Sequence, residues 1–359
     1  MRNKQPVCAK RNRRNFVCLG VILAVFFGYQ SFLMAQTNKV ASASDQGTTA
    51  SSSASTAPIP YIKGAFRHVL DPPGQKTDTK KRKWYINDHC FFVDENDTIH
   101  WFGITNPFPP RGKGYYGAGT HLHVGHATAK DPFGPWTEHK HAFELPEDAK
   151  KGAYVGACFV MKHGGEYFMI LNHGTLLSVA KSADLETWEL VKGVPKIDLG
   201  GGTRDPCVVR QDDGTYLLYA TAGHDNFGAV ALGESKDMKH WKQKPPAMVS
   251  TIRGNWGPIE SPFVYRHGDT YYLLINHSHH QYQETIVFAS KDPTHFDWGH
   301  PLCTLFGHAS EVFDWKGKTY ISHCGIEDRH WKKTGLYLAE LGWSRVEAGP
   351  KKPRDEEKE

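Results

Sequence analysis

Ser182-Ala183-Asp184-Leu185-Glu186-Thr187-Trp188 is one of four copies of a short phrase in which a small residue and an Asp precede a Trp. The Asp residues of successive copies lie 53, 53 and 55 residues apart. Each copy follows a short apolar run, so the phrase is typical of a turn between two β-strands. A spacing of this size indicates a repeat architecture. The other three copies occupy residues 129–136, 235–241 and 290–298.

A second phrase lies between these copies and consists of a short apolar segment, a polar turn and an aromatic-rich segment. One such turn is Asp212-Asp213-Gly214, a sequence that favours a β-hairpin. The aromatic-rich segments begin at Ile99, Tyr167, Tyr216, Tyr271 and Tyr320. Because no helical periodicity of useful length interrupts these units, we predict an all-β, five-bladed β-propeller with about four antiparallel strands per blade.

Composition excludes several classes of protein. The 359 residues are 39% hydrophobic and 12% aromatic, which excludes a disordered, collagen-like or multi-span membrane protein. The formal charge is +5, but the first 35 residues hold six Lys or Arg and no acid, so the remainder carries −1. A near-neutral body gives no reason to expect nucleic-acid binding. The seven cysteines include no C-x-x-C pair, which predicts neither a disulfide framework nor a thiolate zinc site.

Residues 1–35 are predicted to be a secretory signal peptide. A basic stretch that ends at Arg14 precedes an apolar run from Phe16 to Phe27, the usual order in such signals. Cleavage after Ala35 or Ala43 would give a secreted or periplasmic protein. The alternative is an uncleaved signal anchor, which would attach the protein to a membrane; without it we expect no stable membrane partner.

The rest of the chain divides by composition. Residues 36–60 are rich in Ser, Thr and Ala and are predicted to be a flexible linker. Residues 61–345 hold the propeller, and residues 61–70 are a candidate for the strand that closes the ring. Residues 346–359 are predicted to be a charged, disordered tail.

Three acids occupy corresponding places in the repeat. Eleven residues before the five aromatic-rich segments lie Asp88, Gly156, Asp205, Glu260 and Ala309. The first strand of each blade lines the central channel, so the three acids should face one space and the two small residues should leave room for a ligand. Carboxylates so close cannot all ionise comfortably, and at least one pKa should rise. A raised acid beside an ionised carboxylate suits glycoside hydrolysis; the alternatives are a cation site or solvated loop acids.

Four further residues are candidates for substrate binding. Arg204 stands beside Asp205 and could donate to sugar hydroxyls or hold a carboxylate in place. Trp256 and Trp84 could stack on a sugar ring or pack within the blades, and His89 could hydrogen-bond a substrate or pack.

A histidine-rich segment invites a metal interpretation. His121, His123 and His126 form an H-x-H-x-x-H pattern, and strand alternation places the first two on one face. No acid in the same phrase completes a zinc site, so packing is the favoured interpretation.

The chain resembles the five-bladed propeller glycoside hydrolases over about residues 84–343. This superfamily includes family 43 and the β-fructosidases of families 32 and 68. The resemblance lies in Ile86-Asn87-Asp88, in Arg204-Asp205-Pro206, which looks like the fructosidase motif, and in Glu260-Ser261-Pro262-Phe263, which looks more like family 43. Gly307-His308-Ala309-Ser310 is similar to the family 43 segment whose His lies by a central metal, often calcium.

The resemblance implies one of two mechanisms. In the inverting, family 43 type, Asp88 is the general base, Glu260 the general acid and Asp205 tunes the acid, which predicts an arabinosidase- or xylosidase-like enzyme. In the retaining, fructosidase type, Asp88 is the nucleophile and Glu260 the acid/base. No cofactor is required in either case, although a structural Ca²⁺ could lie in the central channel near His308.

Two other functions stay open on the same scaffold. One is a carbohydrate-binding propeller without catalysis, and the other is a glycoside phosphorylase or transferase. The expected partner in each case is an oligo- or polysaccharide. We favour the hydrolase because a lectin needs no general acid and because few basic residues lie near the three acids to bind phosphate.

Overall fold

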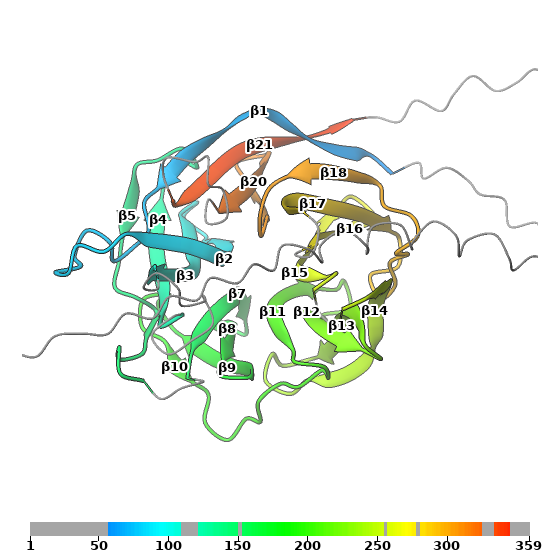
Figure 1. The fold of residues 1–359 in the computed structure, drawn as a ribbon, viewed down its shortest axis with the longest axis horizontal. Helices are drawn as coiled ribbons and strands as arrows, with labels where there is room; N and C mark the ends of the chain where they lie inside the picture. Colours follow the sequence, from blue (N-terminus) through cyan, green and yellow to red (C-terminus); the bar gives the residue numbers. More distant parts are fainter. Residues whose placement is uncertain are drawn as a thin grey trace, which may run out of the picture. The chain divides into compact units, whose positions relative to one another are not determined.

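The computed structural model describes residues 57–108, 121–149, 153–254, 257–277, 281–324 and 334–344. Its strands form five antiparallel sheets that are arranged radially around a common centre (Figure 1). The five-bladed β-propeller that the repeats predict is therefore confirmed. Among the described residues, no helix has the length and apolar character needed to cross a membrane.

Blades 2, 3 and 4 are sheets of four sequential strands, whereas blade 1 has a fifth strand and blade 5 takes one strand from the other end of the domain. Blade 1 contains β2 (Trp84–Val93), β3 (Ile99–Pro107), β4 (His123–Ala129) and β5 (Trp136–Glu138), and β6 (Phe143–Glu144) also pairs with β4. Blade 2 contains β7 (Val155–His163), β8 (Glu166–His173), β9 (Leu176–Ser182) and β10 (Glu189–Leu190). Blade 3 contains β11 (Arg204–Arg210), β12 (Tyr216–His224), β13 (Phe227–Ser235) and β14 (Lys242–Arg253). Blade 4 contains β15 (Glu260–His267), β16 (Thr270–His277), β17 (Gln281–Ser290) and β18 (Cys303–Phe306).

Blade 5 is closed by a strand from the other end of the domain. It contains β19 (Val312–Trp315), β20 (Lys318–Cys324) and β21 (Leu336–Ser344), and its outermost strand is β1 (Ile59–Leu70). β1 pairs antiparallel with β21 from Ile59↔Ser344 to Leu70↔Leu336, as Figure 1 shows. The expected closing strand is thus present, and it begins two residues earlier than the predicted range.

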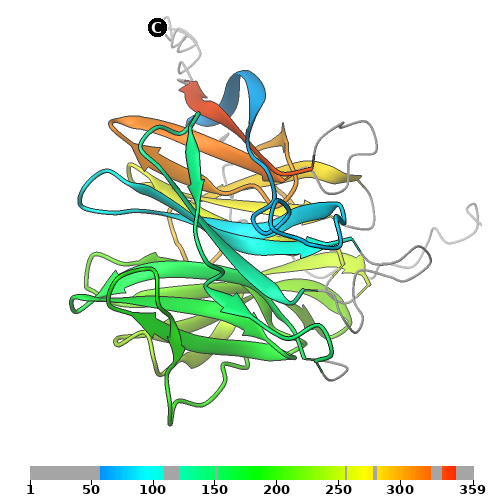
Figure 2. The ribbon, with the colours of Figure 1, turned by 90° about the vertical axis from the view of Figure 1, so that its left-hand side faces the viewer.

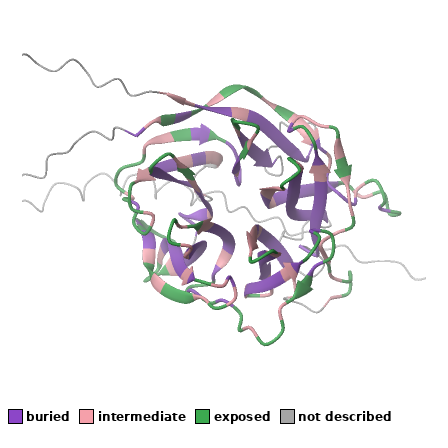
Figure 3. Cartoon of the chain, turned by 180° about the vertical axis from the view of Figure 1, so that it is seen from behind, coloured by how far each residue is buried: buried purple, intermediate pink, exposed green. Residues whose placement is uncertain are grey.

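The first strands of the blades surround the centre of the ring. β2 contacts β7, β7 contacts β11, β11 contacts β15, and β19 contacts β2. In the side view of Figure 2 the strands run mostly along the axis of the ring. Figure 3 shows that the inner strands are largely buried, whereas exposed residues gather at the turns and the outer edges.

The repeated Asp-to-Trp phrase forms the turn between the third and fourth strands. In blade 2, the carboxylate of Asp184 accepts hydrogen bonds from the backbone N–H groups of Glu186 and Thr187 at 2.9 and 2.8 Å. The indole N–H of Trp188 donates to the carbonyl of Leu185 at 3.1 Å, and the ring is 9% exposed. The phrase therefore recurs because blades 1 to 4 use the same type of turn between their third and fourth strands.

Candidate active site

The first strands of blades 1 to 4 each contain a β-bulge near the predicted acids. In blade 3, for example, pairing with the second strand shifts between Arg204 and Cys207. The corresponding shifts lie between Ile86 and His89, Val155 and Cys158, and Glu260 and Phe263. A bulge bends the strand and redirects its side chains, which is why such irregularities occur next to active sites.

The bulges correct the sequence alignment of the three acids. Asp88 and Asp205 lie within their bulges, but Glu260 is the last residue before the bulge in its own strand. Glu260 therefore takes the place that Arg204 has in blade 3, and Asp205 corresponds to Ser261. Counting back from the aromatic segment misses this offset because the hairpin turn of blade 4, where Arg266 pairs with Tyr271, is one residue shorter than that of blade 3, where Arg210 pairs with Tyr216.

Asp88 reaches across the centre of the ring. The hydroxyl of Ser261 in blade 4 donates a hydrogen bond to Asp88 Oδ1 at 2.5 Å. Blades 1 and 4 are separated by blade 5, so this contact spans the channel rather than a junction between neighbouring blades. Ser261 has φ 48° and Asp205 has φ 55°, so the bulge holds both residues in the left-handed region. This uncommon backbone is stabilised by the contacts of their side chains.

Arg204 connects the other two acids. Its Nη2 donates to Glu260 Oε1 at 2.8 Å, and its Nε lies 3.2 Å from Asp205 Oδ2. Asp205 and Glu260 are 7% and 4% exposed. Of the two roles predicted for Arg204, the structure shows the one in which it holds carboxylates. A single guanidinium that neutralises two buried carboxylates makes their burial tolerable.

Electrostatics place all three acids in one site. The pKa of Asp88 is raised to about 7, first because burial disfavours its charge and then because the charges of Asp205 and Glu260 oppose it. The hydrogen bond from Ser261 and the charge of Arg204 act in the opposite direction. Asp88 itself is half-buried. One of the three carboxyls thus carries a raised pKa, as expected for acids that share a space.

Three polar residues that sequence reasoning missed support this arrangement. Asn172 Oδ1 accepts the backbone N–H of Asp205 at 3.1 Å, and the hydroxyl of Thr221 donates to Asp205 Oδ2 at 3.0 Å. Asn276 Oδ1 accepts the backbone N–H of Ala309 at 3.0 Å. All three are buried, and each lies five residues after the start of its aromatic-rich segment. The equal spacing of polar residues in apolar strands was the signal that could have revealed them.

The small residues at the remaining two positions serve packing. A Cβ added to Gly156 would lie 3.3 Å from the side chain of Asn172, so the space beside it holds that side chain. Ala309 is 3% exposed and donates its N–H to Asn276. The prediction that these two residues leave room for a ligand is therefore wrong at Gly156, where Asn172 fills the space and supports Asp205.

Three buried thiols and one further acid lie two residues after the positions aligned with the predicted acids. Cys90, Cys158 and Cys207 are free and buried, as expected for packing residues. The pKa of Glu311 is raised well above its usual value, chiefly by burial and also by Cys90 and Asp88. Its Oε2 has no hydrogen-bond partner within the described part of the chain. Burial therefore favours the neutral form of the Glu311 carboxyl.

Two predicted substrate-binding residues are packed inside blade 1. His89 is 2% exposed, and its ring nitrogens contact Ser322 Oγ at 2.8 Å and the carbonyl of Asn87 at 3.0 Å. Trp84 is 4% exposed, and its indole N–H donates to Asp78 at 3.0 Å. Neither side chain offers a surface to a sugar, which corrects both predictions. Trp256 lies outside the described residues.

His308 contacts the protein rather than presenting a calcium ligand. Its Nε2 lies 3.0 Å from Asn87 Oδ1, and its backbone N–H donates to His323 Nδ1 at 2.9 Å. Calcium takes oxygen ligands, and the groups of metal-binding side chains found among the described residues do not include His308. His308 therefore does not fit as a direct ligand, and an ion held near it through water stays a prediction.

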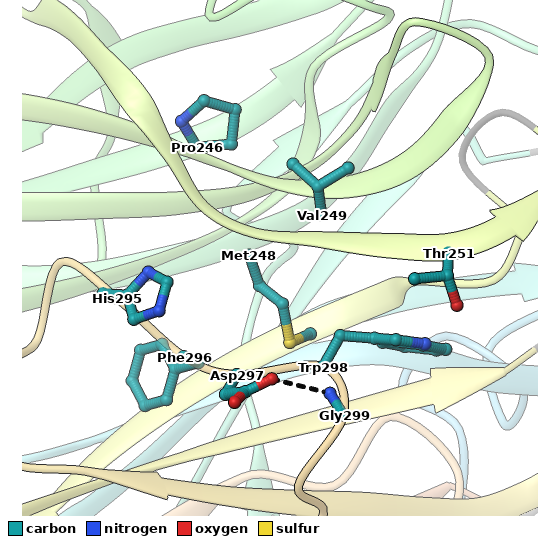
Figure 4. Close-up of a pocket in the computed structure, with 9 residues that line it drawn as sticks. All are labelled: Pro246, Met248, Val249, Thr251, His295, Phe296, Asp297, Trp298 and Gly299. Atoms are coloured by element: carbon teal, nitrogen blue, oxygen red, sulfur yellow. Dashed lines mark hydrogen bonds between the residues drawn. The ribbon is translucent and has the colours of Figure 1, made fainter. Parts of the chain in front are cut away.

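A separate hollow of about 600 Å³ lies at the outer side of blades 3 and 4 (Figure 4). β14 contributes Met248 and Thr251 to its lining, and the segment before β18 contributes Phe296 and Trp298. None of the three acids lines it. It is a surface feature away from the central channel.

The fold and a family comparison identify the class of protein. Residues 199–353, which span blades 3 and 4 and most of blade 5, match the family described as "Glycosyl hydrolases family 43". The protein is therefore a glycoside hydrolase built on a five-bladed β-propeller. Within that class, the match makes residues 199–353 similar to family 43, over less than half of the chain. No curated protein matches the sequence.

Solved structures share the fold at low sequence identity. The β-xylosidase RS223 is 15% identical with a TM-score of 0.58, over 79% of this chain and 98% of that one. A family 43 β-xylosidase/α-arabinofuranosidase from a compost microbial metagenome, solved with xylotriose in a calcium-free form, is 15% identical with a TM-score of 0.54, over 78% and 95%. The family 32 β-fructofuranosidase of Bombyx mori is 15% identical with a TM-score of 0.57, over 79% and 65%. At these identities the similarity concerns the fold.

Proposed function

We propose that the protein hydrolyses O-glycosidic bonds of xylose- or arabinose-containing saccharides with inversion, using Asp88 as general base and Glu260 as general acid. The family 43 match supports the hydrolase chemistry. The neighbours described as a β-xylosidase and a β-xylosidase/α-arabinofuranosidase support the choice of sugar. Asp205 is the third member, and it orients Glu260 through the guanidinium that both acids share.

The observation that carries this proposal is the convergence of the three acids. The hydrogen bond from Ser261 brings Asp88 beside the residue that follows Glu260. The two contacts of Arg204 bring Glu260 and Asp205 together. Hydrolysis of a glycosidic bond requires a general acid and a general base that face the same space, and these two come from different blades.

The reaction can be written with these side chains alone. A water molecule between Asp88 and the sugar loses a proton to the Asp88 carboxylate while its oxygen attacks the anomeric carbon. The bond from that carbon to the leaving oxygen breaks, and Glu260 donates its proton to that oxygen. Because water attacks from the face opposite the leaving group, the first product has the inverted configuration.

The protonation state of Asp88 sets a condition on this mechanism. A general base must be ionised, but the pKa of Asp88 is raised to about 7 in the free protein. The reaction also needs a proton on Glu260, which in the free protein is paired with Arg204. The interacting carboxyls share their protons as a set, so the reactive form is the one in which the shared proton lies on Glu260 instead of Asp88. Above about pH 7 the set loses this proton and with it the general acid, and we therefore expect kcat/KM to decrease as the pH rises through about 7.

A retaining mechanism is the second candidate, and one observation favours it. Arg204-Asp205-Pro206 has the fructosidase form, and the Bombyx mori β-fructofuranosidase shares the fold with a TM-score of 0.57. In that case Asp88 attacks the anomeric carbon itself. Proton NMR of the first-formed anomer separates the two, because only direct attack by water inverts the configuration.

The decisive test is hydrolysis of a panel of nitrophenyl xylosides, arabinofuranosides and fructose-containing oligosaccharides by the wild type and by Glu260→Gln. We expect the variant to lose about 10²–10⁴-fold in kcat/KM on substrates with poor leaving groups, the usual contribution of a general acid. Glu234→Gln, on the outer part of blade 3, is the control and should retain activity. Equal turnover by Glu260→Gln and the wild type would remove Glu260 from the acid role.

We also propose that residues 1–35 direct export, as their basic and apolar order suggests. Sequencing the N-terminus of protein recovered from the periplasm or the medium tests this. Cleavage predicts a new start at Gln36 or Ser44, whereas an intact N-terminus in the membrane fraction would support the anchor.

A further inference from the structure

Three potential metal ligands meet on the outer part of blade 1. His123 begins β4 and pairs with Glu144, the last residue of β6. His141 lies three residues before Glu144. One nitrogen of each ring and a carboxylate oxygen all lie within 4.8 Å of one another. The acid that the H-x-H-x-x-H segment lacks is thus supplied by a neighbouring strand.

The distances suit ligands of a shared ion better than they suit hydrogen bonds. His123 Nε2 lies 3.7 Å from Glu144 Oε1, and His141 Nδ1 lies 3.4 Å from Glu144 Oε2. Hydrogen bonds from nitrogen to oxygen are about 2.7–3.2 Å long. Two ligands of a tetrahedral Zn²⁺, each about 2.0–2.2 Å from the metal, lie roughly 3.3–3.5 Å apart. Small movements of Glu144, whose side chain is 65% exposed, would bring all three into that range.

A hydrogen bond orients the ring of His123. Its Nδ1 lies 2.9 Å from Asn106 Oδ1, and the same oxygen accepts the backbone N–H of Leu122 at 3.0 Å. Because a backbone N–H can only donate, this Asn106 atom is the carbonyl oxygen, and His123 Nδ1 must carry the hydrogen. The lone pair of Nε2 is then available on the side that faces Glu144. Metal-binding histidines usually have this type of support.

Packing also fixes this pair of imidazoles. The ring of Trp84 lies 5.2 Å from that of His123 and 6.3 Å from that of His141. The side chain of Arg82 is itself paired with Asp78 and Glu147.

A second cluster of the same composition provides an internal comparison. His126 and His139 lie 3.6 and 3.3 Å from Glu186. Their rings, however, stack with an interplanar angle of 22° and centroids 4.5 Å apart, so their in-plane lone pairs do not converge on one point. The rings of His123 and His141 are inclined by 54°, which allows their lone pairs to converge.

We propose that His123, His141 and Glu144 form a binding site for a divalent transition-metal ion such as Zn²⁺. Three protein ligands would leave a fourth position for water. The ion would connect the start of β4 to the loop and strand that end at Glu144, and so stabilise blade 1. The proposal is independent of the glycosidase mechanism, because none of the three acids of the central channel belongs to the site.

Zinc binding to the full chain tests the proposal. Protein produced without a polyhistidine tag is stripped with a chelator and dialysed against Zn²⁺, and bound zinc is measured per chain. We expect Glu144→Gln to bind one equivalent fewer than the wild type, and zinc to raise the Tm of the wild type but not of this variant. Glu186→Gln, which removes the matching acid of the stacked cluster, is the control and should retain that equivalent.

The zinc contents of the variants distinguish the proposed site from the second cluster. An unchanged zinc content in Glu144→Gln would overturn the proposal, and so would a loss in Glu186→Gln as large as that in Glu144→Gln. His141→Ala must show the same missing equivalent as Glu144→Gln. The side chain of Glu144 is 65% exposed and that of His141 is 13% exposed, so circular dichroism must show an intact β-propeller in each variant before its zinc content is compared.

Discussion

Replacing Asp88 by Asn removes an ionisable group that the fold keeps protonated up to a pH of about 7. Asn has nearly the same shape and can still accept the hydrogen bond from Ser261 through its carbonyl oxygen. The substitution therefore isolates the free energy of ionising Asp88 in the site. If Asp88 is the general base, the variant also loses activity.

The size of the effect follows from the difference between the folded and unfolded pKa values. Raising the pKa of Asp88 from 3.8 to about 7 corresponds to about 4 kcal/mol, at about 1.36 kcal/mol per pH unit. Below pH 3.8 both states hold the proton, and the wild type loses stability as the pH rises until the folded protein ionises near pH 7. Because water reaches part of Asp88, we expect about 2–4 kcal/mol.

Urea unfolding at a series of pH values from 4 to 8.5 measures this directly. The free energy of unfolding of Asp88→Asn minus that of the wild type should increase by about 2–4 kcal/mol between pH 4 and pH 7.5 and then level off. Asp225→Asn serves as the control, because that carboxylate is 88% exposed and the same difference should stay flat.

A flat difference for Asp88→Asn across this pH range would refute the electrostatic argument. A decrease with pH would reverse its sign, since it would mean that the folded protein prefers the ionised form of Asp88. Either result would also remove the reason to expect kcat/KM to fall as the pH rises through about 7.

Three other substitutions test neighbouring contacts. Arg204→Ala leaves two buried carboxylates without their shared cation, and we expect a loss of about 3–5 kcal/mol in urea unfolding at pH 7; a loss below about 1 kcal/mol would contradict the bridging role. Ser261→Ala removes the hydrogen bond that lowers the pKa of Asp88, so the alkaline limb of the kcat/KM profile should move to higher pH, and a shift to lower pH would disprove this. Glu311→Gln replaces an acid whose neutral form is favoured by burial with a neutral amide, so its free energy of unfolding at pH 7 should change by less than about 1 kcal/mol, and a loss of several kcal/mol would contradict this effect of burial.

The architecture was predictable because the repeated residues form the same type of turn in four of the five blades. In blade 2 this turn is capped by Asp184 and packed by the ring of Trp188, and the same residue types recur in blades 1, 3 and 4. The closing strand was also within reach of sequence reasoning, since an apolar segment before the first full blade needs a partner. β1 begins at Ile59 because its pairing with Ser344 extends that far.

The detail of the site depends on contacts between blades, which a single sequence does not display. A hairpin turn one residue shorter than that of blade 3 moves Glu260 into the place of Arg204, and the residue types alone do not show where the two strands begin to pair. The burial of His89 depends on Ser322, which lies 233 residues away. Sequence spacing identified the three acids, but the partners of each acid arise from the curvature of the ring.

The pairing of β1 with β21 affects how the protein is made. During translation β1 emerges early and must wait without its partner until residues 336–344 leave the ribosome. Until then the nascent chain exposes unpaired strand edges, which are prone to join other chains. Released chains truncated before residue 336 should therefore be far more sensitive to proteases and aggregation than the full chain.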